Sequence, residues 1–405
     1  MIDSYEEDLQ QITKNRQRSH MIDEEEAEIP PEYLLTRQLC ADLVQEAFKL
    51  NSYSIMYLVR KENLYKLQNL LYFNIKDGLR SLNFSNEESS KNSEQDKLLR
   101  EILIEKLLRA SDCSIISLII MTSNQIPKEL VNEDIIEQVS SFVKTHLTET
   151  IFPHYDAVYK TAAHAHDGSK NTKRKLMNQF NSSTGHGSTN ILNNKTKQMQ
   201  QFYNRMREIL SLIGELVSQI DLTDTIIITL SSLSVMCFFV ENINDLQLES
   251  LKILTNIFTR YSKHRQLVLD DILNSLVKLH PNKRNSRLYK CLNGDSIQMF
   301  SALLLQLIQC EVTTIDNFTD EIKDEKSGDL TFEEKETFLI NSFEDSSQTA
   351  KKFLSIFFSK CKAKQADSDF RPIFENFIQD LLITVNKPEW PVSETILNLL
   401  GNLLK

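Results

Sequence analysis

Residues 246–280 read LQLESLKILTNIFTRY, then SKHRQ, then LVLDDILNSLVKLH. Apolar side chains recur at helical spacing on both sides of the SKHRQ segment. These positions are Leu246, Leu251, Leu254, Phe258, Val268, Ile272, Leu276 and Leu279. We therefore predict two amphipathic helices. They must stack on neighbouring helices, because a lone helical hairpin cannot bury its apolar stripe.

The turn between the two predicted helices is basic, since Lys263, His264 and Arg265 follow one another in it. We call these three residues the basic corner. The turn offers no apolar position that a core would fill. We expect the basic corner to lie on the rim of a helical stack, facing a partner.

Composition favours an all-α chain. Eight glycines and eight prolines are few for 405 residues, because average usage would give roughly 28 and 20. So little turn chemistry argues against an all-β or βαβ protein, whose loops need many residues with positive φ. The six cysteines are widely spaced and form no CxxC pair, which is typical of a reduced, intracellular protein.

No export signal is visible at the acidic N-terminus. The most apolar run, 226–240, is interrupted by hydroxyl side chains and is shorter than the ~20 residues of a membrane span. We expect a soluble protein with no membrane partner.

Charge is segregated along a chain whose net charge is −10. Residues 1–32 hold ten acids against three bases, and residues 313–347 hold eleven acids against three bases. Residues 157–207 carry nine bases against one acid, and residues 260–290 carry eight bases against two acids. Because fields are screened over ~10 Å, two basic blocks can attract an anionic polymer to an acidic protein. The alternative is that each charged run is only solvated surface.

Periodicity and low-complexity sequence divide the chain into six parts. The first two are an acidic N-terminal tail at 1–31 and a helical, HEAT-like block at 32–160. Residues 161–195 are rich in Asn, Ser, Lys and His, and we expect a disordered basic insert there. Helix pairs recur every ~40 residues through 196–312, the period of HEAT and armadillo repeats. The remaining parts are an acidic linker at 313–346, with one weak helix near its end, and further HEAT repeats at 347–405.

The predicted fold is therefore an all-α HEAT-repeat (armadillo-like) solenoid. A leucine-rich helix runs to the last residue without a polar capping repeat. Because a solenoid needs such a cap to end, we expect the chain to be cut from a longer one.

Catalytic and cofactor signatures are missing from the sequence. It contains no GxxxxGKS/T, HExxH or GxSxG motif, and no GxGxxG after a strand. His154, His164, His166 and His186 cluster in and beside the insert, but they lack cysteine partners and a rigid frame. We expect no enzyme activity, no cofactor and no metal site. An enzyme would need a polar cleft of convergent titratable groups, which the sequence does not indicate.

Several longer strings carry a specific resemblance. In chain order they are IMTS (120–123) with IPK (126–128), FPHYDAVY (152–159), FFVEN (238–242), RYSKHRQL (260–267), ALLLQLIQC (302–310), and the series RP, FENF, QDLL and TVNKPEWP within 371–391. Together, and in this order, they closely resemble the Nipped-B (cohesin loader) family. The resemblance covers roughly residues 95–405, and the first 95 residues match less securely.

The resemblance implies a hook-shaped HEAT-repeat protein that engages the cohesin ring through its ATPase heads and its kleisin subunit. Such a protein stimulates ATP hydrolysis by cohesin, clamps double-stranded DNA against the heads and promotes cohesin loading onto chromatin in the nucleus. Members of the family also carry an N-terminal arm that binds a tetratricopeptide adaptor, and further repeats. We expect both to be missing from this chain.

The resemblance also implies a DNA-facing surface on the middle of the chain, with its Lys-His pair at Lys263 and His264. The basic start of the 196–220 helix and the loop LHPNKRNSRLYK are further candidates, since lysine and arginine bind phosphates without reading bases. The residues predicted to bind DNA are Lys263, His264, Arg265, Lys195, Lys197, Arg205, Lys283, Arg284 and Arg287. Two alternatives remain open: His264 as a helix-terminus cap, and Trp390 as a packed corner between repeats.

A HEAT scaffold of another class, such as a nuclear transport receptor or a phosphatase scaffold, is the alternative function. It would predict acidic inner helices and partner binding that is insensitive to salt. A DNA clamp instead predicts binding that weakens steeply with salt and drops when Lys263 and His264 become Glu.

Overall fold

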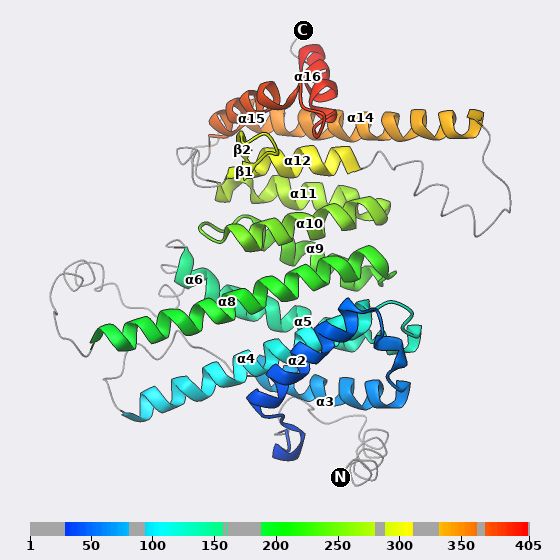
Figure 1. The fold of residues 1–405 in the computed structure, drawn as a ribbon. Helices are drawn as coiled ribbons and strands as arrows, with labels where there is room; N and C mark the ends of the chain where they lie inside the picture. The colour runs from blue at the N-terminus through cyan, green and yellow to red at the C-terminus, as the bar shows by residue number, and fades with distance from the viewer. Residues whose placement is uncertain are drawn as a thin grey trace, which may run out of the picture.

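The computed structural model describes residues 29–80, 94–156, 159, 188–279, 288–310, 332–362 and 369–403. Figure 1 shows helices stacked one above another, from α2, α3 and α4 near the N-terminus to α14, α15 and α16 at the other end. The described part of the chain is helical apart from short connections and one small hairpin. The predicted all-α solenoid is confirmed. Within the part of the chain described here, no helix combines the length and apolar content needed to cross a membrane.

The N-terminal block begins the stack with three long helices. Its elements are the 3₁₀ turn η1 (Pro31–Tyr33), α2 (Arg37–Ser52), η2 (Met56–Leu58), α3 (Lys61–Arg80), α4 (Glu94–Thr122), η3 (Lys128–Leu130), α5 (Glu133–His146), the π-helix η4 (Leu147–Ile151) and α6 (Phe152–Tyr155). Helix α4 runs without a break through the stretch that contains Ser111 and Ser114. The Ser111 and Ser114 hydroxyls donate to the carbonyls one turn earlier, so they are satisfied without interrupting the helix.

The middle block contains the stretch 246–280. Its elements are α8 (Ser188–Gln219), α9 (Asp224–Phe238), α10 (Asn244–Arg260), η5 (Ser262–His264), α11 (Arg265–Ser275) and η6 (Leu276–Lys278). The two predicted helices are confirmed, and every predicted apolar position except Leu279 is at most 3% exposed. Helix α10 packs chiefly against α8 and α9, and α11 packs chiefly against α9, so the stack buries both stripes.

The C-terminal block departs from the sequence predictions in two places. Its elements are β1 (Leu288–Lys290), β2 (Ser296–Gln298), α12 (Met299–Cys310), α14 (Phe332–Lys362), α15 (Arg371–Thr384) and α16 (Val392–Leu403). The strands pair antiparallel, with Tyr289 opposite Ile297, around a turn in which Gly294 has φ +91°. An Asn-Gly pair is a strong hairpin signal, and the all-α prediction overlooked it at Asn293-Gly294.

The second difference is that α14 runs unbroken from Phe332 to Lys362, whereas the sequence predicts a weak helix near the end of the acidic linker 313–346 and separate repeats from 347. Its C-terminal half is anchored by packing, since the buried Phe357 ring lies 5.3 Å from Phe374 and 6.0 Å from Phe300. Once that half is helical, each added residue gains a hydrogen bond at little cost, so the helix extends toward its N-terminus. Figure 1 shows this end of α14 projecting beyond the stack.

Buried carboxylates join successive layers of the stack. Asp380 of α15 accepts hydrogen bonds from the Gln298 backbone N–H at 2.9 Å and the Ser301 hydroxyl at 2.6 Å, at the start of α12. Asp156, at the end of α6, accepts from the Glu241 backbone N–H at 3.0 Å. Both carboxylates are at most 4% exposed, so each holds two distant segments at a fixed distance.

Candidate nucleic-acid interface

The basic corner lies in η5 and at the first residue of α11, and it packs against the start of helix α9. Asp224 lies in the first turn of α9, where the helix dipole favours a carboxylate. Its Oδ1 atom is 2.6 Å from Lys263 Nζ and 3.0 Å from His264 Nε2. These two contacts, with Lys263 the larger influence, hold the pKa of Asp224 below its usual value.

Exposure separates the first two of the three predicted DNA contacts in the basic corner. The Lys263 side chain is 63% exposed, so its ammonium can meet an outside anion while it stays beside Asp224. The His264 side chain is only 11% exposed, and Nε2 is already engaged by Asp224. A phosphate contact through Nε2 of His264 would therefore require the ring to leave Asp224, whereas a structural role as the partner of Asp224 requires no movement.

The third residue of the corner, Arg265, is turned toward the end of helix α10. Its Nε atom donates to the Phe258 carbonyl at 2.8 Å, and its guanidinium lies 5.5 Å from the centroid of the Phe258 ring. Arginine near a helix C-terminus satisfies carbonyls that have no partner within the helix. The structure thus places Arg265 as a C-terminal cap of α10.

The residues just before the corner tie α10 to the end of α8. Arg260 Nη2 lies 2.6 Å from Asp221 Oδ1, and Nη1 donates to the Val217 carbonyl at 3.1 Å. The Tyr261 hydroxyl accepts from the Leu222 backbone N–H at 3.0 Å and lies 3.2 Å from the carbonyl oxygen of Ile220. These contacts fix the corner between two layers of the stack.

Counting charges over 260–290 missed two acidic neighbours of the corner, Asp221 and Asp224. Both precede α10 by more than a helix in sequence, yet they lie beside Arg260 and Lys263 in the structure. An acid just before the apolar run 226–240, which is typical of a helix start, is the signal that could have found Asp224. The corner is consequently less positive than its sequence indicates, and its most exposed cation among these contacts is Lys263.

The second predicted group, at the start of helix α8, is not a single surface. Arg205 Nε lies 2.8 Å from Asp112 Oδ1, and its Nη1 donates to Glu208 at 2.9 Å. Asp112 is fully buried, and burial raises its pKa, although Arg205 and Arg37 act in the opposite direction. Arg205 therefore neutralises a buried carboxylate of α4, while Lys197 is exposed on the same helix.

The remaining predicted residues cannot be placed by their side chains. Lys195 lies in α8, but its side chain is outside the described part of the structure. Lys283, Arg284 and Arg287 lie outside the described residues altogether. The same holds for the predicted insert 161–195 up to residue 187, after which α8 begins.

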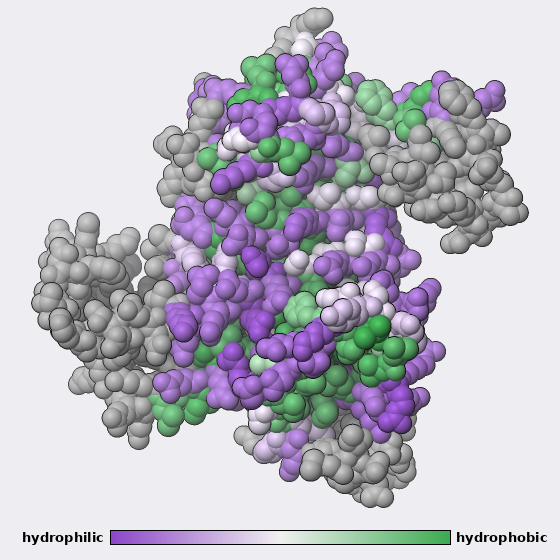
Figure 2. All heavy atoms as spheres, viewed as in Figure 1, coloured by the Kyte–Doolittle hydropathy of each residue, from purple (hydrophilic) through white to green (hydrophobic). Residues whose placement is uncertain are grey.

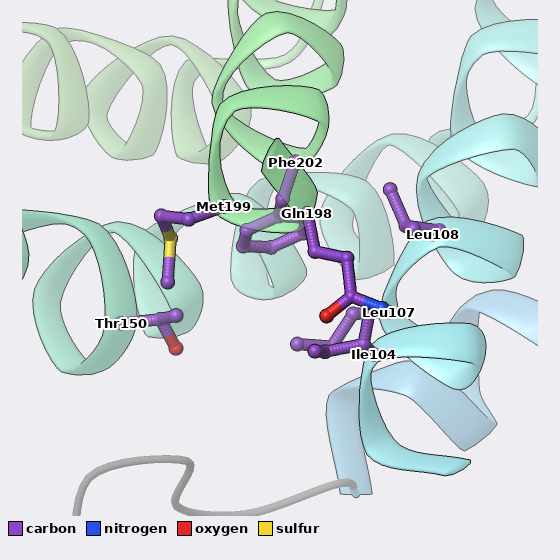
Figure 3. A pocket seen from close by; sticks show the side chains of 7 residues that line it. All are labelled: Ile104, Leu107, Leu108, Thr150, Gln198, Met199 and Phe202. Atoms are coloured by element: carbon purple, nitrogen blue, oxygen red, sulfur yellow. The ribbon is translucent and has the colours of Figure 1, made fainter. Parts of the chain in front are cut away.

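The packed interface between α4 and α8 leaves little room for a small ligand. Figure 3 shows the pocket there, lined by Ile104, Leu107, Leu108, Thr150, Gln198, Met199 and Phe202. Its volume is about 10 Å³, which is close to the space of one water molecule. Among the described residues, no three His, Cys, Asp or Glu side chains are grouped so that they could hold a metal ion.

The surface of the stack differs along its length. Figure 2 shows a mostly hydrophilic face over α10 and α11, and apolar side chains gathered where α2 passes to α3. The large exposed side chains in that passage are Tyr53, Tyr57, Leu58 and, at the start of α3, Tyr65. A hydrophilic face suits contact with a solvated polyanion better than the apolar passage does.

Sequence comparison relates the chain to a set of named proteins, although no family model matches it. It is 38% identical to the Nipped-B-like protein B of Danio rerio over 384 residues, which cover 93% of this chain and 13% of that protein. It is 38% identical to the Nipped-B-like protein of Homo sapiens over 383 residues, with the same coverage. The Nipped-B protein of Drosophila melanogaster is 36% identical over 77% of this chain and 15% of its own length. The chain thus spans less than a sixth of these relatives.

A solved structure shares the fold of this chain. The C-terminal fragment of the Chaetomium thermophilum cohesin loader SCC2 superposes with a TM-score of 0.66 at 21% sequence identity. The match covers 91% of this chain and 27% of that fragment. The arrangement of helices in the stack is therefore shared with a solved α-solenoid.

Proposed function

The chain belongs to the Nipped-B family, and on that premise we propose that it takes part in loading cohesin onto chromatin. The observation that carries the proposal is 38% identity across 93% of the chain. In this role the chain binds the cohesin complex, through its ATPase heads and kleisin, and double-stranded DNA in the nucleus. It stimulates the cohesin ATPase and performs no catalysis of its own.

The proposed DNA contact is centred on Lys263. Its side chain combines high exposure with a fixed position, because Asp224, Arg260 and Tyr261 hold the corner between α8, α9 and α10. Lysine at such a rim binds phosphate oxygens and releases condensed counterions. Lys197 of α8 adds exposed charge on a neighbouring layer. Asp224 makes DNA binding by Lys263 less favourable, because a phosphate must share the Lys263 ammonium with the Asp224 carboxylate.

The DNA proposal is tested by fluorescence anisotropy of a labelled duplex at several salt concentrations. We expect Lys263→Glu to weaken binding and to reduce the slope of log K against log salt by about one. Lys252→Glu is the matched control, because the Lys252 side chain is 62% exposed on α10 and also pairs with a carboxylate, Glu249 at 3.0 Å. The control should bind DNA within about twofold of the wild type.

His264 is tested separately, because two roles are open to it. A phosphate contact predicts that His264→Ala weakens DNA binding under conditions in which the variant is folded. A purely structural contact with Asp224 predicts a lower melting temperature with little change in DNA affinity. Binding that is indifferent to salt, or unchanged when Lys263 and His264 both become Glu, contradicts the DNA proposal as a whole.

The cohesin proposal is tested by ATP hydrolysis of purified cohesin with and without DNA, in the presence of this chain. Direct capture of cohesin on the immobilised chain accompanies it, since binding and stimulation are separable. No capture at low salt would contradict the cohesin role. Salt-insensitive capture of other proteins would favour the scaffold alternative.

A further inference from the structure

Two cysteine thiols meet at the interface between α2 and α4. The Sγ atoms of Cys40 and Cys113 lie 3.7 Å apart, and both residues are fully buried. The two residues are 73 positions apart in the sequence, so only the packing of α2 on α4 brings them together. The function proposed above makes no use of either thiol.

The surroundings of the two thiols give them different reactivities. A hydrogen bond from the Cys113 thiol holds the pKa of Cys40 below its ordinary value, although burial acts in the opposite direction. The nearby guanidinium groups of Arg109 and Arg37 also favour the Cys40 thiolate. Burial raises the pKa of Cys113 well above its ordinary value. Because the thiolate is the reactive form of cysteine, Cys40 is the thiol that meets an oxidant first.

The position of α2 in the stack gives an oxidant access to the buried thiols. The buried residues of α2 are Cys40, Val44 and Ala47, which form a single stripe, and the helix packs chiefly against α4. Figure 1 shows α2 lying across α4 near the N-terminal end of the stack. A helix that is held on one side opens locally at a lower free energy than unfolding of the whole chain. Such an opening exposes both thiols together.

We propose that Cys40 and Cys113 are a modification site, at which a peroxide joins them in a disulfide that locks α2 onto α4. The Cys40 thiolate attacks hydrogen peroxide, which gives a Cys40 sulfenic acid and hydroxide. The Cys113 sulfur then attacks the Cys40 sulfur, so the S–S bond forms and the S–O bond breaks. The leaving hydroxide takes the Cys113 proton and departs as water. In sum, two thiols are oxidised to one disulfide, and one hydrogen peroxide is reduced to two waters.

The packed structure is close to the geometry that the bond needs. An S–S bond is about 2.05 Å long, so the two sulfur atoms must approach each other by about 1.7 Å from their separation of 3.7 Å. Rotation of the two side chains and a small shift of α2 supply this movement. Once formed, the bond links helices that are distant in sequence, so α2 can no longer detach from α4.

The disulfide is tested on the full chain, treated with excess hydrogen peroxide and compared with the same chain kept in dithiothreitol. After alkylation of the remaining thiols, trypsin yields peptides 38–49 and 110–128, each of which holds one of the two cysteines. We expect mass spectrometry to find these peptides joined in the oxidised chain and separate after reduction. Cys40→Ser and Cys113→Ser should each abolish the joined product. Cys361→Ser, which removes a half-buried thiol elsewhere, is the matched control and should leave it unchanged.

Amide hydrogen exchange tests whether the bond locks α2. The amides of α2 should exchange at least about tenfold more slowly in the oxidised chain than in the reduced chain, whereas those of α16, at the other end of the stack, should not change. This comparison needs no variant, so it holds whatever the stability of the serine variants. No joined peptide, joining only after the chain is unfolded in urea, or equal exchange of α2 in the two states would overturn the proposal.

Discussion

At the scale of single residues, His146 shows how burial sets charge. It is 2% exposed, its Nε2 lies 3.1 Å from the Gly78 carbonyl oxygen, and its ring meets Phe142 edge-to-face at 4.7 Å. Burial lowers the pKa of His146 to about 4, although the Gly78 carbonyl acts in the opposite direction. The ring is therefore neutral at physiological pH and donates Nε2–H to Gly78.

The pKa of His146 predicts a pH dependence of stability. Between its ordinary pKa of 6.5 and the folded value of about 4, the unfolded chain binds a proton that the folded chain does not. Stability from this residue is full above pH 6.5 and falls as the pH drops toward 4. From pH 7.5 to 5.5 we expect it to remove about 1.4 kcal/mol.

Urea unfolding at the two pH values, followed by circular dichroism, measures this loss. The variant His146→Gln keeps a side-chain donor for Gly78 but cannot titrate, so its loss over the same range should be smaller by about 1.4 kcal/mol. Equal pH dependence in the two proteins would show that His146 is not responsible.

At the scale of elements, Gly78 determines how closely α3 approaches α4. A Cβ atom at this position would collide with Cβ of Ala110 and would lie 3.1 Å from Cε2 of Phe142. The Gly78 carbonyl is also the partner of His146 in α5. One residue without a side chain thus lets three helices meet.

We expect Gly78→Ala to destabilise the chain by about 1–3 kcal/mol, because overpacking forces helices apart. This outweighs the gain of about 1 kcal/mol that alanine has over glycine in a helix. Gly401→Ala in α16 is the control, since a Cβ there meets nothing within 4 Å and the variant should be neutral or slightly more stable. Melting temperatures of the two variants and the wild type measure these effects. A Gly78→Ala variant as stable as the wild type would contradict the close packing of α3 on α4.

At the scale of the whole molecule, each layer of the stack contacts chiefly its neighbours (Figure 1). The stability of such an array is close to a sum over repeats and their interfaces. Trp390, at 3% exposure beside α12 and α16, reports on one end of the stack, whereas Gly78 lies near the other. Distant repeats can therefore unfold separately.

We predict that Gly78→Ala lowers the urea midpoint measured by circular dichroism and leaves the midpoint measured by Trp390 fluorescence unchanged. The physical reason is that each layer packs chiefly on its neighbours, so a loss of packing at one end need not reach the other end. A parallel shift of both midpoints would instead identify the chain as one cooperative unit.

Local pattern was sufficient for most of the fold. Apolar spacing placed α10 and α11 and their buried faces, because a helix exposes its period of 3.6 residues in the sequence itself. Turn chemistry held the same kind of information at Asn293-Gly294, where the hairpin was overlooked. The weak helix predicted near the end of the acidic linker is the N-terminal part of α14, and it joins the rest because the helix extends from an anchor of buried phenylalanines in its other half.

The sequence by itself determined a helical solenoid of the Nipped-B family with a basic corner at 263–265. Only the tertiary structure decided what those charges do: Lys263 and His264 meet Asp224, Arg265 caps α10, and Arg205 pairs with Asp112. Helical period is a property of neighbouring residues, whereas the partner of a charge comes from any segment that packing brings within a few ångströms. Asp224 lies about 40 residues before His264 in the chain and 3.0 Å from it in space.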